Sequence, residues 1–186
     1  MSQKTLLLSV VLCLTPVIFA LSANADEYTC RGSIGPIAVD NLRVPQGATC
    51  SLNGTFVKGN IKVETNSTLY AFQVRVIGNV QAEDAALVEV LSWSSVAGSI
   101  QIKQGEAARI DGVRIDSDLQ FDKNERRLVA NNNTIGGNLQ VFNNTGGLWI
   151  NANVIDGNLQ CKENRPAPIG GNNTVRGNKE DQCANL

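Results

Sequence analysis

Hydrophobic and polar positions alternate along most of this chain, in a pattern that recurs every 19 or 20 residues. Each copy centres on a glycine or a close substitute, with aliphatic residues at fixed distances on both sides. The copies are DNLRV from Asp40, GNIKV from Gly59, GNVQA from Gly78, GSIQI from Gly98, SDLQF from Ser117, GNLQV from Gly137, GNLQC from Gly157 and, in decayed form, GNKED from Gly177. A period of two is typical of a strand with one buried face, so each copy is predicted to hold a strand of about seven residues through the glycine.

The aligned columns favour strands over helices. The position two residues before each glycine is always β-branched, which suits an extended backbone: Val57, Val76, Val96, Ile115, Ile135, Ile155 and Val175. A second, weaker strand is expected where Leu148 and Ile150 alternate with Trp149 and Asn151, and Leu128 with Ala130, Leu69 with Ala71 and Cys50 with Leu52 fall in the same columns. An asparagine column stands at Asn133, Asn153 and Asn173. Asparagine tolerates left-handed turns and bonds neighbouring backbone, and amides stacked at equal positions can also form a ladder.

A strand-rich unit of this length cannot bury its own apolar face, whereas stacked copies bury it by parallel pairing of equivalent strands. The sequence therefore predicts an all-β fold, a single-stranded parallel β-helix or β-solenoid of seven to eight coils over residues 40–177, between caps at 26–39 and 178–186. The alternative is a twisted β-sandwich, although antiparallel hairpins would not require equal columns in every copy. The repeat resembles the parallel β-helix of the pectin-lyase-like proteins and, less closely, the bactofilins. This resemblance rests on repeat geometry and implies the fold rather than a function.

The first 25 residues have the pattern of a secretory signal peptide. Lys4 precedes an apolar run from Leu6 to Leu21, and Ala23-Asn24-Ala25 supplies the small residues of a cleavage site. We therefore expect a secreted or periplasmic protein; the alternative is an uncleaved membrane anchor.

Four cysteines follow this segment, namely Cys30, Cys50, Cys161 and Cys183. An even number in an oxidising compartment suggests disulfides. Three connectivities are open, and Cys30–Cys50 with Cys161–Cys183 closes the shortest loops. We expect these two bridges to staple the ends of the solenoid, where a stack of coils exposes core and unpaired strands.

The composition excludes several kinds of functional site. Lys and Arg number 16 against 17 Asp and Glu, and histidine is absent. The near-neutral balance argues against a nucleic-acid partner. The absence of histidine excludes Ser-His and Cys-His nucleophile pairs and any histidine-containing metal site. No cofactor and no metal are implied.

Two surfaces are candidates for ligand binding. Gln120, Gln140 and Gln160 belong to an outward polar column that suits an extended glycan; the alternative is a solvated face stabilised by amide ladders. If Leu148 and Ile150 point inward, Trp149 points outward, and its column is predicted to contain Tyr70, Val90, Val129 and Ile169. Such a stripe would stack sugar rings or dock a partner, although a one-residue slip would turn it inward.

Carboxylates are the candidate catalytic groups. Asp116, Asp118 and Asp122 fall in one coil. Asp116 and Asp118 are expected to face outward from one strand at ~6.5–7 Å, a separation that suits a general acid and base in sugar hydrolysis. A pair of acids would also suit Ca²⁺. The alternative is that these acids only solvate the surface, because the coils carry no long loops to build a cleft.

Together these features predict a structural or adhesive, glycan-binding role for an exported solenoid, with an extracellular or cell-wall polysaccharide as partner. The alternatives are a polysaccharide-acting enzyme of pectin-lyase-like type and a fibre subunit that self-associates end to end. No nucleic-acid partner is expected, and no membrane partner after signal cleavage.

Overall fold

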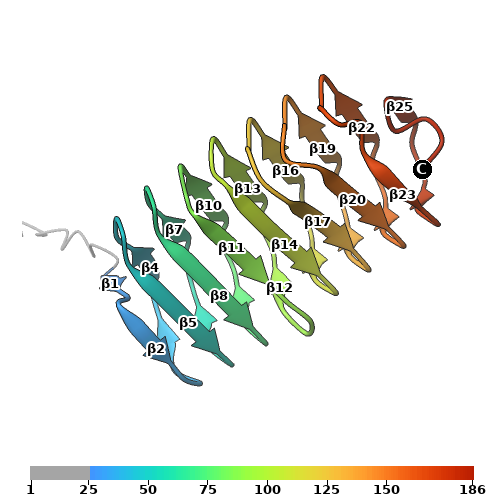
Figure 1. The fold of residues 1–186 in the computed structure, drawn as a ribbon. Coiled ribbons are helices and arrows are strands. Elements are labelled where there is room, and N and C mark those ends of the chain that lie inside the picture. Colours follow the sequence, from blue (N-terminus) through green and yellow to red (C-terminus); the bar gives the residue numbers. More distant parts are fainter. Residues whose placement is uncertain (1–25) are drawn as a thin grey trace, which may run out of the picture.

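The protein, described for residues 26–186 by a computed structural model, winds into about eight stacked coils of parallel strands (Figure 1). The predicted signal peptide, residues 1–25, lies outside the described residues. Every strand pairing is parallel, so the β-sandwich alternative is wrong and the β-solenoid is confirmed.

The strands form three sheets that run along the stack. Sheet A contains β1 (Glu27–Thr29), β4 (Asn41–Val44), β7 (Ile61–Val63), β10 (Val80–Glu83), β13 (Ile100–Lys103), β16 (Leu119–Asp122), β19 (Leu139–Phe142), β22 (Leu159–Lys162) and β25 (Lys179–Asp181). Sheet B contains β2 (Gly32–Ile34), β5 (Thr49–Asn53), β8 (Thr68–Phe72), β11 (Leu87–Val90), β14 (Ala107–Asp111), β17 (Leu128–Asn131), β20 (Leu148–Asn151) and β23 (Ile169–Gly171). Sheet C contains β3 (Ala38–Val39), β6 (Phe56–Val57), β9 (Arg75–Val76), β12 (Ser95–Val96), β15 (Arg114–Ile115), β18 (Thr134–Ile135), β21 (Val154–Ile155) and β24 (Thr174–Val175).

Equivalent apolar side chains lie over one another in the core. Val96, Ile115, Ile135 and Ile155 pair successively in sheet C, and each is at most 1% exposed. The β-branched column therefore has the packing role that its alternation predicts. One side chain per coil in each inward column, aliphatic in most coils, fills the interior without any helix in residues 26–186.

The predicted seven-residue strand through each glycine is wrong, because the chain bends there. Val76 ends a strand of sheet C and Val80 begins a strand of sheet A, so Gly78 forms the corner between two sheets. A Cβ on Gly78 would lie 2.5 Å from Asn60 Oδ1 and 2.6 Å from the Gly59 carbonyl oxygen of the preceding coil. The Asn60 side chain occupies this space because it accepts the Asn79 backbone N–H at 2.8 Å. The Gly-Asn pair is therefore a corner motif in which one coil's asparagine supports the next coil's turn.

The predicted asparagine ladder is present and buried. Asn133 Nδ2 donates to Asn153 Oδ1 at 3.0 Å, and Asn153 Nδ2 donates to Asn173 Oδ1 at 2.9 Å. Each amide also donates to a backbone carbonyl, as Asn153 does to Ala130 at 2.8 Å. The ladder thus satisfies polar groups at a core corner that water does not reach.

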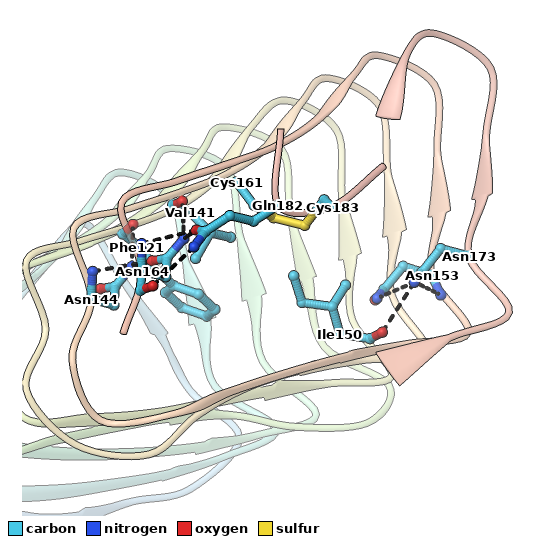
Figure 2. Close-up of a disulfide and its surroundings, with 10 residues drawn as sticks. All are labelled: Phe121, Val141, Asn144, Ile150, Asn153, Cys161, Asn164, Asn173, Gln182 and Cys183. Atoms are coloured by element: carbon cyan, nitrogen blue, oxygen red, sulfur yellow. Dashed lines mark hydrogen bonds between the residues drawn. A yellow bond between two sulfur atoms is a disulfide. The ribbon is translucent and has the colours of Figure 1, made fainter. Parts of the chain in front are cut away.

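A second buried ladder was not predicted. Asn124, Asn144 and Asn164 stack in the same way, and Gln182 ends the ladder by accepting the Asn164 N–H at 2.9 Å. Figure 2 shows the two ladders on opposite sides of the Cys161–Cys183 bridge. The 20-residue spacing of these asparagines was a usable sequence signal.

Both predicted disulfides are present, Cys30–Cys50 and Cys161–Cys183, near the two ends of the stack. Residues 26–39, expected as a cap, contribute strands β1, β2 and β3, which pair with the next coil. At the other end, Lys179 and Asp181 take the register positions that Leu159 and Cys161 hold in the coil before. Charged residues at core positions of an edge strand discourage a further strand from pairing there.

Candidate functional site

The outer face of sheet B carries one outward side chain per coil in an unbroken column. The column members are Ser51, Tyr70, Glu89, Arg109, Val129, Trp149 and Ile169. Trp149 therefore shares a column with Tyr70, Val129 and Ile169 as predicted. The placement of Val90 is wrong: Val90 is fully buried and pairs with Ala71 and Ile110, and Glu89 takes the outward position. The sequence Val88-Glu89-Val90 gives a weak signal for the register, because Glu89 is the only polar residue that indicates which side chains face outward.

In this column, aromatic and aliphatic side chains lie on both sides of a pair of ionic groups, Glu89 and Arg109. Tyr70 is 40% exposed and Ile169 is 55% exposed, while Trp149 is half-buried and Val129 is buried. Phe72, in the neighbouring outward column of the same strand as Tyr70, is also exposed. The face is therefore not a continuous apolar stripe. An ionic centre separates Tyr70 on one side from Trp149 and Ile169 on the other.

A groove of about 380 Å³ lies in the ionic centre. Its lining includes Leu87 and Ala107, which pair with each other in sheet B, and Arg127, which directly precedes β17 of the next coil. The short Ala107 side chain between two longer ones leaves the depression. Glu89 and Arg109 lie along one side, so the groove offers both a carboxylate and guanidinium groups to a ligand.

Arg109 is held by an ion pair beside the groove. Its Nη2 and Nε donate to Asp111 Oδ2 at 2.8 and 3.3 Å. Burial alone would raise the pKa of Asp111, but hydrogen bonds from Asn132 and Arg109 outweigh it and lower that pKa. The hydrogen bond to Asp111 is also the main cause that raises the pKa of Arg109, with a further contribution from Glu89.

Arg127 lies against the indole of Trp149, with its guanidinium carbon 4.7 Å from the ring centroid. The indole fits here because Gly147 has no side chain: a Cβ there would lie 3.3 Å from two atoms of the indole ring. Gly147 also has a φ of 85°, which glycine adopts without strain. Sequence reasoning missed Arg127, Glu89 and Arg109, because a charged residue on a strand face is ordinarily only a solvated group. It also missed Trp93, which is 82% exposed in the turn after β11.

The predicted glutamine residues lie on sheet A, a different sheet from Tyr70 and Trp149. Gln120, Gln140 and Gln160 stand in register on its outer face. Gln140 donates to Gln160 at 2.9 Å, and Gln160 donates to Glu180 at 2.8 Å. Gln140 and Gln160 therefore have hydrogen-bond partners within sheet A, as expected for a ladder that stabilises a solvated face.

The expected geometry of the carboxylates is wrong. Asp116 and Asp118 do not share a strand, because β15 ends at Ile115 and β16 begins at Leu119. Asp116 pairs with Arg114 Nε at 2.8 Å, while Asp118 supports the next corner by accepting the Asn138 N–H at 2.7 Å. The corner replaces the predicted continuous strand and gives these acids structural partners.

Asp122 ends β16 and lies beside a depression of about 400 Å³ on sheet A, together with Gln120, Phe142 and Lys162. Among residues 26–186, no group of three or more cysteine, aspartate or glutamate side chains is placed to hold a metal ion. Within the same range, no helix has the length and hydrophobicity needed to span a membrane.

Comparisons with protein-family models, with curated proteins and with solved structures each found no match. The class that the fold defines is therefore a disulfide-stapled parallel β-solenoid, and its function has to be inferred from its surfaces.

Proposed function

We propose that this protein is a non-catalytic, exported solenoid that binds an extended polysaccharide along the outer face of sheet B. The observation that carries the proposal is the groove at Ala107, which Glu89 and Arg109 help to line. These two residues belong to the outward column that also presents Tyr70 and Trp149, with one side chain per coil. Parallel strands repeat every ~4.8 Å, so this face offers regularly spaced contacts along one direction. A linear polymer is the ligand shape that uses such an array.

The chemistry of the face suits sugars. Exposed aromatic rings present flat apolar surfaces, and carboxylate and guanidinium groups accept from and donate to hydroxyls. The outward column lies on paired strands of sheet B, so the face has no long loops that could build a deep cleft. Binding without bond cleavage is the role that such a surface supports best.

The enzymatic alternative lacks comparable support. Asp116 and Asp118 are engaged by Arg114 and by a corner amide, as described above, and they lie away from the sheet B groove lining. End-to-end fibre assembly is disfavoured by Lys179 and Asp181, which a stacked second copy would have to bury. Neither the enzymatic role nor fibre assembly is supported by a surface comparable to the outer face of sheet B.

An exported location fits the two disulfides, which form and persist in oxidising compartments. We therefore place the polysaccharide partner outside the cytoplasm, in the periplasm, the cell wall or the surroundings.

The test is a binding assay of residues 26–186 against a panel of soluble polysaccharides by affinity electrophoresis. We expect Tyr70→Ala to weaken binding by roughly ten-fold or more, the loss typical of a truncated aromatic anchor. Trp149→Ala should weaken binding as well, because it removes the ring against which Arg127 lies. Gln140→Ala, on the outer face of sheet A, is the matched control and should bind as the wild type does. Absence of binding to every polymer, or equal loss in the sheet A control, would overturn the proposal.

A further inference from the structure

Arg127 differs from the other arginines around the groove in having no carboxylate partner among residues 26–186. Arg109 is bound to Asp111, and Arg126, the immediate neighbour of Arg127, pairs with Glu106 Oε2 at 3.1 Å. The contact that the structure gives the Arg127 guanidinium is with the indole of Trp149. One positive charge is therefore exposed at the groove wall without a neutralising carboxylate.

The indole ring lies against that charge, with its centroid 4.7 Å from the guanidinium carbon. A guanidinium stacked on an aromatic face keeps its N–H edge free, and this edge matches the two oxygens of a carboxylate. Trp149 is in turn held down over Gly147, which leaves room for the ring. Arg127, Trp149 and Gly147 thus form a prearranged fork for a planar anion.

This arrangement also changes the role of Trp149. Because the guanidinium lies over the ring, that face of the indole is not free to stack a sugar. Trp149 is then a positioning residue for Arg127, whereas the exposed Tyr70 and Phe72 provide the apolar contact surfaces.

We infer that the ligand is a carboxylated polysaccharide, and that Arg127, oriented by Trp149, binds its carboxylate through two parallel hydrogen bonds at the groove. This inference rests on the proposed function, since it names the ligand class of the same face. Arg109 and Asp111 neutralise one another in their ion pair, and Glu89 remains as a hydrogen-bond acceptor, so these groups bind sugar hydroxyls beside the carboxylate. The binding energy is expected to contain an electrostatic part that salt screens.

The experiment compares polygalacturonate with the same polymer after reduction of its carboxyl groups. Wild-type protein is expected to bind the carboxylated form roughly 10- to 100-fold more tightly, the range for one charge-assisted bidentate contact. Arg127→Gln should remove this preference while keeping the weaker binding to the reduced polymer. Arg126→Gln, an exposed and ion-paired neighbour, should leave the preference unchanged.

A second variant separates the positioning role from direct contact. Trp149→Ala should reduce the preference for the carboxylated polymer, and Trp149→Phe should restore part of it because a benzene ring still supports the guanidinium. Circular dichroism of each variant checks that the coils remain folded.

The outcomes distinguish the two proposals. Equal binding of native and reduced polymer by the wild type, or a preference that survives Arg127→Gln, would overturn the inference while leaving polysaccharide binding in place. Tighter binding of dextran sulfate than of polygalacturonate would replace the carboxylate by a sulfate and so refute the assigned ligand class. No binding to any of these polymers or to neutral dextran would overturn both.

Discussion

Replacing Asn153 by alanine removes the middle rung of a buried asparagine ladder. The Asn153 side chain is fully buried and takes part in four hydrogen bonds: it accepts from the Asn133 N–H and from Asn133 Nδ2, and it donates to the Ala130 carbonyl and to Asn173 Oδ1. Alanine can replace none of them. The substitution also leaves a small cavity between two coils.

The magnitude follows from the groups that lose a partner. The Asn133 backbone N–H, its side-chain N–H and the Ala130 carbonyl would remain buried without the partner that Asn153 supplies. A buried polar group without a partner costs about 1–3 kcal/mol. Relaxation at the corner reduces the sum, so we expect Asn153→Ala to lower the free energy of unfolding by about 3–6 kcal/mol.

Asn153→Asp is a more specific test of the ladder than Asn153→Ala, because aspartate keeps the shape of the side chain and replaces only the Nδ2 donor by an oxygen. The second carboxylate oxygen would face the Ala130 carbonyl and Asn173 Oδ1, which are both acceptors. Burying such a charge is costly, so at pH 7 this variant should be at least as unstable as Asn153→Ala. Protonation of the new carboxyl restores one donor, and the deficit should shrink as the pH falls.

Urea denaturation followed by circular dichroism measures these differences at fixed temperature and pH. Asn178→Ala is the matched control, since Asn178 is an exposed asparagine of the last coil and its change should stay within about 0.5 kcal/mol. A loss below 1 kcal/mol for Asn153→Ala, or an aspartate variant that is more stable than the alanine variant at pH 7, would show that the ladder does not hold the corner as described.

Other perturbations test the corners, the ends and the ion pair. Gly78→Ala should cost about 2–3 kcal/mol in urea denaturation because its Cβ would meet Asn60 Oδ1 at 2.5 Å, whereas Gly35→Ala, with open space around it, should be near neutral; equal effects would contradict the corner packing. Loss of the Cys161–Cys183 bridge by double substitution to alanine should cost about 3 kcal/mol and speed hydrogen exchange in the last coil before the middle ones; uniform acceleration along the stack would argue against a local staple. The lowered pKa of Asp111 means that its carboxylate stabilises the fold above the unfolded pKa of about 4, and that this contribution disappears as the pH falls through the folded pKa. Asp111→Asn should therefore lower the melting temperature at pH 7, by the equivalent of about 1 kcal/mol, and the gap to wild type should shrink as the pH falls below the unfolded pKa; a gap that is constant with pH would remove the ionic explanation.

The regular columns made the solenoid predictable from sequence. An apolar residue in every copy, such as Ile115 and Ile135, requires the same burial each time, and parallel stacking meets that requirement. The cysteine pairing was predicted from the shortest loops, and these loops are about one coil long, so Cys30 and Cys50 lie in neighbouring coils. The asparagine ladder at Asn153 was predictable for the same reason.

The corners and the working face were harder to predict. The alternation of apolar and polar residues through Gly78 predicts one continuous strand. A bend at Gly78 that keeps the apolar residues before and after it facing inward produces the same sequence pattern. Asp116 and Asp118 were misplaced for this reason, and the Gly-Asn pair was the turn signal that could have corrected them. Arg127 was not predictable as a candidate, since its contact with Trp149 and the small Ala107 beside it appear only when neighbouring coils are stacked.

In-register stacking of coils is the premise of both the fold and the binding face, and distances between spin labels on sheet A measure it directly. With one label at Lys62 and the second at Gln120, Gln140 or Gln160, the pairs lie three, four and five coils apart in the register of the sheet. We predict backbone separations of about 14, 19 and 24 Å, which grow by ~4.8 Å for each added coil. A distance that stays constant or decreases as coils are added would contradict the stacked solenoid.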